Sequence, residues 1–590
     1  MDSTLNNKNI KNMVKIIFTK LSITRRLQLL FLLFFTIFAG IAEVISIGAV
    51  MPFLGVLINP EIITNSSFVI SIPKLHNALN TGNSIAVITF IFIFFTLFAG
   101  LIRIVLIWIQ TRVSYEIGID FSIEMYRLTL YQDYMAHVNQ NSSQTISSIT
   151  NKSTTIVSNA IQPTITIISS TIMLSMILIS LFIIDPFIAT TGLLGFLFIY
   201  LLVIFLVKGG LKKSSEKISI HQVKTLKALQ EGLNGIRDIL LDCNQDKYLR
   251  EFSTSEILLR RAYANTYVLG VAPRFGIEAF GMILIAIIAY SVSETDAGVY
   301  SALPILGALA LGAQRMLPLM QQIYTGWTSL VGGKDSIYDA LEILCLKLNY
   351  LSNEQQGEKL LFERAIRFEG VGFRYDVNAD WVLRDVNILI PKGAIVGVIG
   401  ESGAGKSTLL DLMMGLLIPT SGVISVDSNI LSEANKSCWY KQVSHVPQSI
   451  FLADATIEEN IAFSESSNKI DFEKIEIAIS IAQLSELIAG LSKKTKTYVG
   501  ERGARLSGGQ VQRIGVARAI YKSAEFLVLD EATSSLDKTT EIKLMDAMSK
   551  FGNKRTIILT THRDSITKYC THLITVKDKT ASINSVNALF

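Results

Sequence analysis

The distribution of apolar and polar positions divides this chain into two unlike halves. In the first half, six apolar runs are each long enough to cross a bilayer, which takes about 20 residues of helix. These runs are residues 28–58, 85–109, 158–184, 187–207, 268–292 and 301–323. The pattern predicts a transmembrane domain of six helices over residues 27–330. Beyond about residue 363 the apolar runs are short and the composition is that of a soluble domain.

Residues 1–26 are polar and basic, and carry six lysines and arginines. The apolar run that follows them is too long for the hydrophobic part of a signal peptide. We therefore expect a cytoplasmic N-terminal segment followed by a retained first helix.

The basic residues of the connecting segments predict the orientation. Residues 59–84 contain one lysine, and the turns at 185–186 and 293–300 contain no Lys or Arg. The segments 110–157 and 208–263 contain fourteen, and basic residues in short flanking loops are retained on the cytoplasmic side. The sequence predicts a multi-pass protein of the cell (inner) membrane, with these two segments and both termini in the cytoplasm.

Both cytoplasmic segments mix apolar and charged residues at helical spacing. This favours spanning helices that continue well beyond the bilayer, with short helices across their far ends at 133–146 and 235–250. The alternative is a solvated loop with helical character. On the opposite side, residues 70–80 fit one apolar face of a short helix on the membrane surface.

Composition narrows the class of protein. Half of the 590 residues are hydrophobic and 17% are charged, against about a quarter in ordinary soluble proteins. The net charge of +5 is too mild to indicate nucleic acid as the main partner. The four cysteines form no CxxC pair, which argues against a zinc site or a disulfide framework. Collagenous and disordered chains are excluded as well.

A polar stretch predicts a linker over residues 331–363, before a domain over 364–590. In this domain a short buried-strand pattern, 395–399, runs directly into a glycine-rich loop and then into a helical pattern, 409–413. Strand, glycine loop and helix are the context of a phosphate-binding P-loop. The loop residues are Gly400, Glu401, Ser402, Gly403, Ala404, Gly405, Lys406, Ser407 and Thr408.

The chemistry of phosphate binding requires these residue types. Glycines allow backbone N–H groups to close around phosphates, and the helix N-terminus adds positive potential. Lys406 would reach the β- and γ-phosphates, and Ser407 would coordinate Mg²⁺. Further on, the buried-strand pattern 526–529 ends in Asp530 and Glu531. We expect Asp530 to bind Mg²⁺ and Glu531 to polarise the attacking water.

Between these strands lies Leu506-Ser507-Gly508-Gly509-Gln510, which reads as the signature motif of ABC ATPases, and the surrounding motifs follow that family's order. The resemblance implies an α/β P-loop ABC ATPase domain that uses ATP and Mg²⁺. It also implies a role for each matching residue: Tyr375 would stack on adenine, Gln448 would touch Mg²⁺ or water, Ser507 to Gln510 would bind nucleotide, Asp537 would belong to the D-loop, and His562 would contact the γ-phosphate. Tyr498 to Gly503 resembles a loop found in exporters, which argues against an importer.

The same resemblance implies a homodimer. In the family each ATP lies between the P-loop of one subunit and the signature motif of the other. One membrane domain and one ATPase domain per chain therefore make half of a transporter. Each catalytic position is filled by a competent residue type, so both sites are expected to hydrolyse ATP.

Three arginines within the predicted spans need an explanation. Arg103, Arg274 and Arg315 each cost about 2.5–3.5 kcal/mol at mid-membrane on insertion scales unless they are shallow, hydrated or paired. One interpretation is internal pairing, with Glu278 four residues after Arg274 and Glu43 near another arginine. The other interpretation is a positive cavity for a phosphate or pyrophosphate, because two carboxylates cannot neutralise three guanidiniums.

The membrane half resembles the bacterial lipid-linked oligosaccharide flippases, through Glu43 with Val50 to Phe53, the Arg103 context, Ala272-Pro273-Arg274, and Arg315 to Pro318. A further basic position of that branch falls on Gln321 or Gln322. The resemblance implies an ATP-driven flippase that moves a lipid-linked saccharide from the inner to the outer leaflet, without a nucleic-acid partner. The alternatives are an exporter of another lipid, a drug or a peptide, and an ATP-gated channel or regulatory membrane protein. The apolar runs exclude a soluble ATPase.

Overall fold

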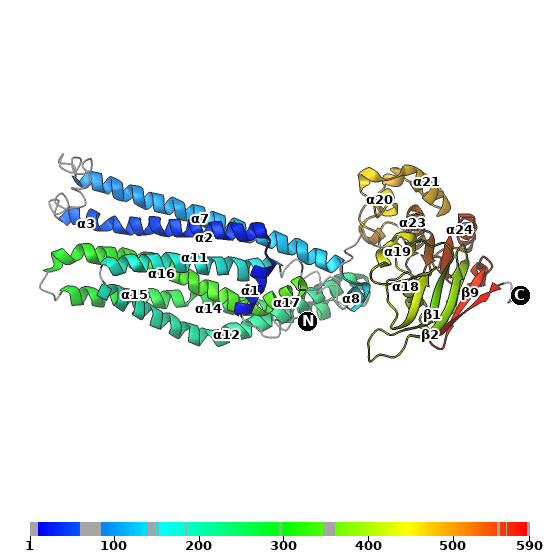
Figure 1. Ribbon diagram of the computed structural model, residues 1–590, viewed down its shortest axis with the longest axis horizontal. Helices are drawn as coiled ribbons and strands as arrows, with labels where there is room; N and C mark the ends of the chain where they lie inside the picture. Colours follow the sequence, from blue (N-terminus) through cyan, green and yellow to red (C-terminus); the bar gives the residue numbers. More distant parts are fainter. Residues whose placement is uncertain are drawn as a thin grey trace. The chain divides into compact units, whose positions relative to one another are not determined.

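The computed structural model describes residues 10–58, 84–139, 149, 153–184, 186–293, 298–345, 360–551, 555–561 and 563–586. Its contacts divide the chain into two compact units (Figure 1). One unit, the membrane unit, comprises residues 1–132 and 139–347. The other comprises residues 133–138 and 348–590, and we call it the ATPase unit after the expectation from its sequence. The predicted surface helix at 70–80 lies outside the described residues.

The membrane unit is built from long helices that run side by side (Figure 1). Its helices are α1 (Ile10–Lys20), α2 (Ile23–Gly48), α3 (Val50–Ile58), α7 (Ser84–Leu130), α10 (Ser153–Ile156), the π-helix η2 (Val157–Ile161), α11 (Gln162–Ile184), α12 (Pro186–Asn234), α13 (Ile236–Leu241), α14 (Gln245–Val271), α15 (Pro273–Ser293), α16 (Gly298–Gly332) and α17 (Lys334–Leu344). One apolar core among its described residues lies between α2, α7, α11 and α16, with Ile177 and Leu319 among the most buried side chains.

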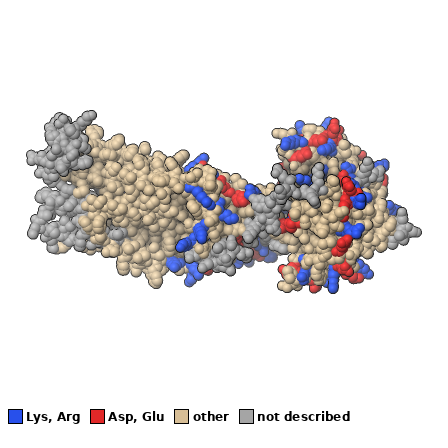
Figure 2. All heavy atoms as spheres, in the orientation of Figure 1, with Lys and Arg blue, Asp and Glu red and all other residues tan. Residues whose placement is uncertain are grey.

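Three stretches of described helix are long and apolar enough to cross a membrane. They are Ile23–Leu57, Ile85–Leu130 and Ser153–Ile183, and they confirm the first three predicted spans. The other three predicted runs lie on α12, α15 and α16. The helices α7 and α12 continue far past their apolar parts, as the mixed apolar and charged spacing predicts. Figure 2 shows a largely uncharged surface over much of this unit, with Lys and Arg gathered at one end.

Proline explains where the predicted spans are interrupted. The run 28–58 forms two helices, because Pro52 has no N–H to donate to the carbonyl of Gly48, where α2 ends. The run 268–292 begins in α14 and continues in α15, which starts at Pro273. Pro273 leaves the carbonyl of Leu269 without its helical donor, and the Tyr324 hydroxyl donates to that oxygen at 2.8 Å.

The ATPase unit contains two sheets. The strands β2 (Leu383–Pro391), β1 (Ala365–Phe373), β4 (Ser421–Val426) and β5 (Asn429–Ile430) form an antiparallel sheet in that order. The second sheet has the order β10 (Thr580–Ser585), β9 (His572–Lys577), β3 (Ile395–Gly400), β8 (Thr556–Thr560), β7 (Phe526–Leu529) and β6 (Val443–Val446). It is parallel except for β10, which pairs antiparallel with β9.

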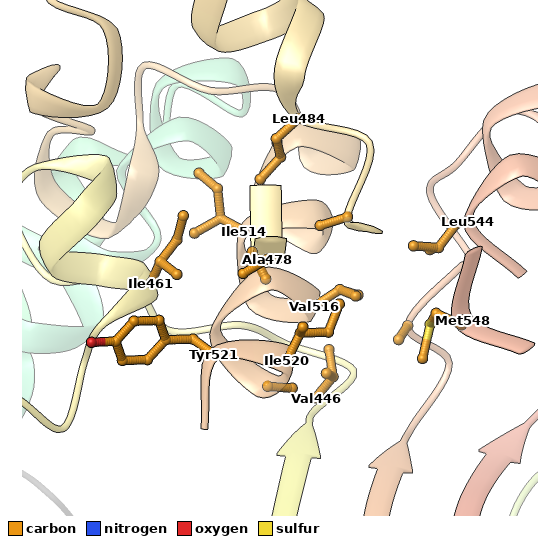
Figure 3. Close-up of a cluster of buried hydrophobic side chains, with 14 of the residues drawn as sticks. Val446, Ile461, Ala478, Leu484, Ile514, Val516, Ile520, Tyr521, Leu544 and Met548 are labelled. Carbon is orange, nitrogen blue, oxygen red and sulfur yellow. The ribbon is translucent and has the colours of Figure 1, made fainter. Parts of the chain in front are cut away.

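Helices and short turns of helix complete the ATPase unit. They are α8 (Tyr134–Asn139), α18 (Lys406–Met413), α19 (Lys436–Gln442), α20 (Ile457–Ile461), η3 (Ser467–Lys469), α21 (Phe472–Ile481), α22 (Ser485–Ala489), η4 (Lys494–Lys496), η5 (Glu501–Gly503), α23 (Gly508–Tyr521), α24 (Lys538–Phe551) and α25 (Asp564–Thr567). Figure 3 shows one of two large apolar clusters, in which Ile514 and Ile520 of α23 pack near Val446 and Ala478. Because β3, β7 and β8 are parallel neighbours, their carboxyl ends lie at one edge, where open α/β sheets bind ligands.

The predicted linker 331–363 needs correction. Residues 334–344 form α17, whose inner face is buried. At the other end, Leu360 and Phe362 are each 2% exposed and belong to the apolar core beneath the antiparallel sheet. A polar average hides both features, because single apolar residues at the ends of a polar stretch can still be buried. Residues 346–359 lie outside the described part of the chain.

Candidate nucleotide site

The glycine loop joins β3 to α18 as the sequence predicts. Gly405 stands immediately before α18 with φ of +101°, and Gly403 has φ of +82°, a backbone region that favours glycine. A Cβ on Gly400 would lie 2.5 Å from the carbonyl oxygen of Val576. The Lys406 ammonium donates to the carbonyls of Gly400 at 2.8 Å and Glu401 at 3.0 Å. The loop carbonyls therefore hold the Lys406 ammonium group at the N-terminus of α18. Ser402 of the same loop is exposed.

The end of β7 meets the start of α18. The Ser407 hydroxyl donates to the Asp530 carboxylate at 3.4 Å, so two oxygen groups from separate elements lie together. Hydroxyl and carboxylate oxygens, with water and phosphate oxygens, are the ligands that Mg²⁺ prefers. These residues fit a magnesium ion, which would neutralise the charge of bound phosphates.

Glu531 follows the strand in a strained conformation, with φ of +49°. Left-handed backbone in a non-glycine residue persists only where its surroundings stabilise it. Here the Glu531 N–H donates to Thr560 Oγ1 at 2.7 Å, and Gln448 Nε2 donates to the Glu531 carboxylate at 2.8 Å. The structure therefore brings Gln448, Asp530 and Glu531 to one place.

Tyr375 lies beside the P-loop helix. Its hydroxyl is 3.1 Å from the Thr408 hydroxyl, and its ring packs edge-on against Phe373 at 5.0 Å. The side chain is 40% exposed, which leaves ring surface for stacking with a flat base.

The signature residues begin α23. Ser507 and Gln510 form a reciprocal capping box, in which each side chain accepts from the other's backbone N–H. Gly508 and Gly509 are the first helical residues, and a Cβ on Gly509 would lie 3.2 Å from the carbonyl oxygen of Ser535. The glycines therefore allow α23 to approach the loop that leads to Asp537.

Asp537 has a local role in the structure. It stands immediately before α24 and accepts from the Thr540 N–H at 3.0 Å. Hydrogen bonds from Thr539 and Thr540 lower the pKa of its carboxyl. The carboxylate therefore caps a helix, and the predicted nucleotide role of Asp537 stays a prediction.

His562 lies outside the described residues, but both neighbours are described. Thr561 is buried at the end of β8. Arg563 pairs with the buried Glu541 at 2.8 Å and donates to the Ser534 carbonyl at 3.1 Å. Arg563 is thus tied to the loop between Glu531 and Asp537.

Two residues in this network were not identified from the sequence. Thr560 Oγ1 donates to Asp530 at 2.9 Å while it accepts from the Glu531 backbone, so it positions both acidic residues. Gln512 accepts from the Ser535 N–H at 3.1 Å and donates to the Ser534 hydroxyl at 3.0 Å. A threonine that ends an apolar strand was a usable signal for Thr560, whereas nothing in the pattern separated Gln512 from an ordinary helical residue.

The electrostatics of this edge are set by burial and by Asp530. Burial and, to a smaller extent, the negative charge of Asp530 together raise the pKa of the Asp411 carboxyl to about 6. Burial lowers the pKa of His445 on β6, and Asp530 opposes that shift. Burial is the largest cause of both pKa shifts.

The helix α8 packs within the same unit. Lys436 of α19 has a side chain only 10% exposed, and it pairs with Asp133 at 2.6 Å and with Glu433. Met135 packs against the apolar core that contains Leu409 and Trp439. The predicted short helix at 133–146 is thus α8, residues 134–139, and the one at 235–250 is α13 followed by the start of α14.

In the membrane unit, Arg103 and Arg315 converge on one acid. Glu43, 2% exposed, lies 2.9 Å from Arg315 and 3.8 Å from Arg103. Arg274 pairs with Glu278 one turn along α15 at 2.6 Å. The internal pairs considered from the sequence are therefore present, and two guanidiniums share a single carboxylate.

The glutamines at the position that is basic in the flippase branch have other partners. Gln321 donates to the Gly270 carbonyl at 3.2 Å, and Gln322 accepts from Ser170 at 2.7 Å. Both side chains therefore join helices of the membrane unit.

Comparisons with known proteins agree with this geometry. Residues 383–534 match the family profile described as ABC transporter. The leukotoxin translocation ATP-binding protein LktB of Mannheimia glucosida is 38% identical over 232 residues, which are 39% of this chain and 32% of that protein. The protein of the same name from Mannheimia haemolytica is 37% identical over the same length. The matched region thus spans about a third of the length of these relatives.

A solved structure matches along almost the whole chain. It is a bacterial Atm1-family ABC exporter with ATP bound, with a TM-score of 0.77, 17% identity and 96% coverage of both chains. The fold is therefore that of an ABC exporter, with an N-terminal helical transmembrane domain and a C-terminal ABC ATPase domain. Within the ATPase unit, residues 383–534 are therefore similar to the domains of the ABC transporter family.

Proposed function

We propose that the protein is an ATP-driven exporter that works as a homodimer and couples hydrolysis to transport across the cell membrane. The observation that carries this proposal is the convergence of Ser407, Gln448, Asp530 and Glu531 at one edge of the sheet, in a chain with an exporter fold. Two ATP molecules would draw two ATPase units together, and hydrolysis would reset the dimer.

Each residue has a distinct part in hydrolysis. Lys406 and the P-loop N–H groups would hold the phosphates, and Ser407 and Asp530 would hold Mg²⁺, which neutralises charge on the transferred phosphoryl group. Glu531 would orient and polarise the attacking water, and Gln448 and Thr560 hold it in place. Tyr375 would stack on adenine, and Ser507 to Gln510 of the second copy would close the site. His562 would contact the γ-phosphate.

We propose further that the cargo is an amphiphile with an anionic phosphate head, such as a lipid-linked saccharide, moved from the inner to the outer leaflet. The cluster of Arg103, Glu43 and Arg315 supports this, because two guanidiniums with one carboxylate leave a net positive charge in a membrane-spanning unit. Guanidinium groups bind phosphate oxygens in pairs.

A second candidate rests on the relatives. LktB is named for leukotoxin translocation, and its 38% identity supports an exporter with a peptide or protein cargo as well. In that case the arginine pairs would only stabilise the helix bundle. An exporter of another lipid or a drug, and an ATP-gated channel, share the same ATPase and would differ in what crosses the membrane.

The cargo proposal is tested by single replacement of Arg103, Arg274 and Arg315 with Gln, with Arg260→Gln as the control. Arg260 also pairs with a glutamate one turn away, but its side chain is 74% exposed on α14. The measurement is ATP turnover stimulated by a polyprenyl-pyrophosphate oligosaccharide. Loss of a charged hydrogen bond to phosphate, about 1.5–3 kcal/mol, predicts a half-stimulating concentration higher by about ten- to a hundredfold for Arg103→Gln and Arg315→Gln. Unchanged stimulation in all three variants would contradict the lipid-linked cargo and favour the second candidate, an exporter of a peptide or protein.

A further inference from the structure

A groove of about 380 Å³ opens within the membrane unit between α1, α2, η2 and α11, with Ile117 of α7 at its back. We propose that it binds one acyl chain of an anionic phospholipid from the cytoplasmic leaflet. This site is separate from the arginine cluster around Glu43, and it rests on the proposed function only in that the unit spans a membrane with the N-terminal end of α2 at the cytoplasmic surface.

The walls suit an apolar chain. Leu29 and Leu32 of α2 line the groove together with Ile161 of η2 and Ile165 of α11. Leu32 is 5% exposed, and Ile161 and Ile165 are 5% and 7% exposed, so this wall is part of the packed bundle. A hydrocarbon placed there would bury apolar surface on both of its sides.

The polar groups in the groove already have partners. Thr36 donates to the Leu32 carbonyl at 2.8 Å and lies 3.3 Å from the Ser169 hydroxyl. Thr164 donates to the Ala160 carbonyl at 2.6 Å. An apolar ligand therefore leaves these hydroxyls satisfied, whereas a polar ligand would gain little from them.

The open side of the groove is apolar. Phe18, Leu30, Leu33 and Ile168 line it and are 52%, 54%, 41% and 47% exposed. Exposed apolar side chains that line one concavity are typical of a binding surface for apolar ligands. In a membrane-spanning unit, this side is open to the hydrocarbon of the bilayer.

A single cation marks one end of the groove. Arg26 lies in the first turn of α2, ten residues before Thr36, which corresponds to about 15 Å along a helix. Its guanidinium lies 5.5 Å from the Phe18 ring centroid and donates from Nη2 to the Thr19 carbonyl at 3.0 Å. Because a guanidinium has five N–H donors, this arrangement fixes the group in place and leaves donors for a phosphate.

The ends of the groove match the two ends of a lipid. Basic residues before the first span indicate the cytoplasmic surface, so Arg26 lies at the depth of the headgroups and Thr36 lies deeper. The helix α1 buries Met13 and Ile17 and exposes Lys15 and Lys20, as a helix at an anionic membrane surface does. Charge at the surface end and an apolar groove below it favour an anionic phospholipid over a neutral one.

The test uses the full-length protein in liposomes without cargo. The probe is phosphatidylglycerol with a photoreactive group at the end of one acyl chain, and labelled residues are mapped by mass spectrometry. We expect labelling near Thr36 and Ser169. The same probe with a phosphatidylcholine headgroup should label these positions about fivefold less, because one basic residue near the surface favours an anionic lipid by about that factor.

Two variants separate the lipid site from nonspecific contact with the bilayer. Leu33→Trp fills the groove and should abolish this labelling, whereas Phe34→Trp, next to it but outside the groove, should keep it. Arg26→Gln should retain the labelling and lose the headgroup preference, and Lys15→Gln should keep both. Equal labelling in Leu33→Trp and Phe34→Trp, or no headgroup preference in the unchanged protein, would overturn the proposal. Crosslinks from groove residues to a second copy of the chain would overturn it too, because a helix of that copy would then fill the groove.

Discussion

Thr560 shows how single residues set the chemistry of the nucleotide site. It ends β8 next to the end of β7, so one hydroxyl reaches the Asp530 carboxylate and the Glu531 N–H together. Without this hydroxyl, the left-handed backbone at Glu531 loses a bond that stabilises it, and Asp530 loses a donor. Both residues that we expect to act on Mg²⁺ and water depend on it.

We predict that Thr560→Val lowers ATP hydrolysis about tenfold or more, because valine keeps the shape and the strand preference but removes both hydrogen bonds. Steady-state phosphate release measures the effect. The matched control is Thr556→Val at the other end of β8, where the hydroxyl accepts only from the Gly393 N–H. That variant should lose stability but keep its turnover. Turnover at the original rate in Thr560→Val would contradict the positioning role.

At the scale of elements, the short helix α8 shows how one end of a long helix is attached to the core of the ATPase unit. It follows the long helix α7 after three residues, yet it packs in the ATPase unit through Asp133 and Met135. The ammonium of Lys436 is nearly buried between two carboxylates. Removal of this cation leaves acidic groups without their partner, so α8 would be held less firmly.

We predict that Lys436→Met leaves basal ATP hydrolysis near its original rate and lowers the stimulation by cargo several-fold. The physical reason is that α8 joins the end of a spanning helix to the surface of the ATPase unit. Lys441→Met, on the exposed face of the same helix α19, is the control and should change neither rate. Equal stimulation in both variants would show that the ion pair does not contribute to coupling.

The sequence predicted the existence of the helices better than the positions where they break or change type. Long apolar runs predicted spanning helices because about 20 apolar residues have few other stable structures. The breaks at Pro52 and Pro273 and the π-helix before Pro163 were missed, since each depends on one local hydrogen bond rather than on a period. The helix α1 was missed because its buried face has only Met13 and Ile17.

The site was predicted unevenly for a similar reason. Motif residues such as Lys406 and Glu531 were found because their chemistry requires fixed residue types at fixed spacing. Thr560 and Gln512 act through bonds between elements distant in sequence. The place of Thr560 at the end of an apolar strand was a usable signal, whereas no local pattern encodes the contacts of Gln512. The sharing of Glu43 by Arg103 and Arg315 required the packing of three helices to be known.

At the scale of the whole molecule, the proposed homodimer makes a prediction about which residues cooperate. If each ATP lies between the P-loop of one copy and the signature motif of the other, the number of intact sites in a mixed dimer depends on which copy carries each substitution. Lys406→Ala removes the phosphate-binding cation, and Ser507→Arg blocks the start of α23. Two kinds of mixed dimer, purified through two different tags, distinguish the arrangements.

A dimer of one Lys406→Ala chain with one Ser507→Arg chain should keep one intact site and hydrolyse ATP at about half the original rate. A dimer of one doubly substituted chain with one unchanged chain should have no intact site. If each site were formed within one chain, the two results would be exchanged. Phosphate release from both purified dimers provides the comparison.

The most direct test of the central claim is ATP-dependent transfer of a fluorescent polyprenyl-pyrophosphate oligosaccharide across proteoliposomes that contain the purified protein. The blank is Glu531→Gln, which should bind ATP but hydrolyse it at least about a hundredfold more slowly, the usual contribution of a general base. We predict transfer with the unchanged protein and ATP, and none with the variant. Robust ATP hydrolysis by the unchanged protein without any transfer would contradict the proposed cargo.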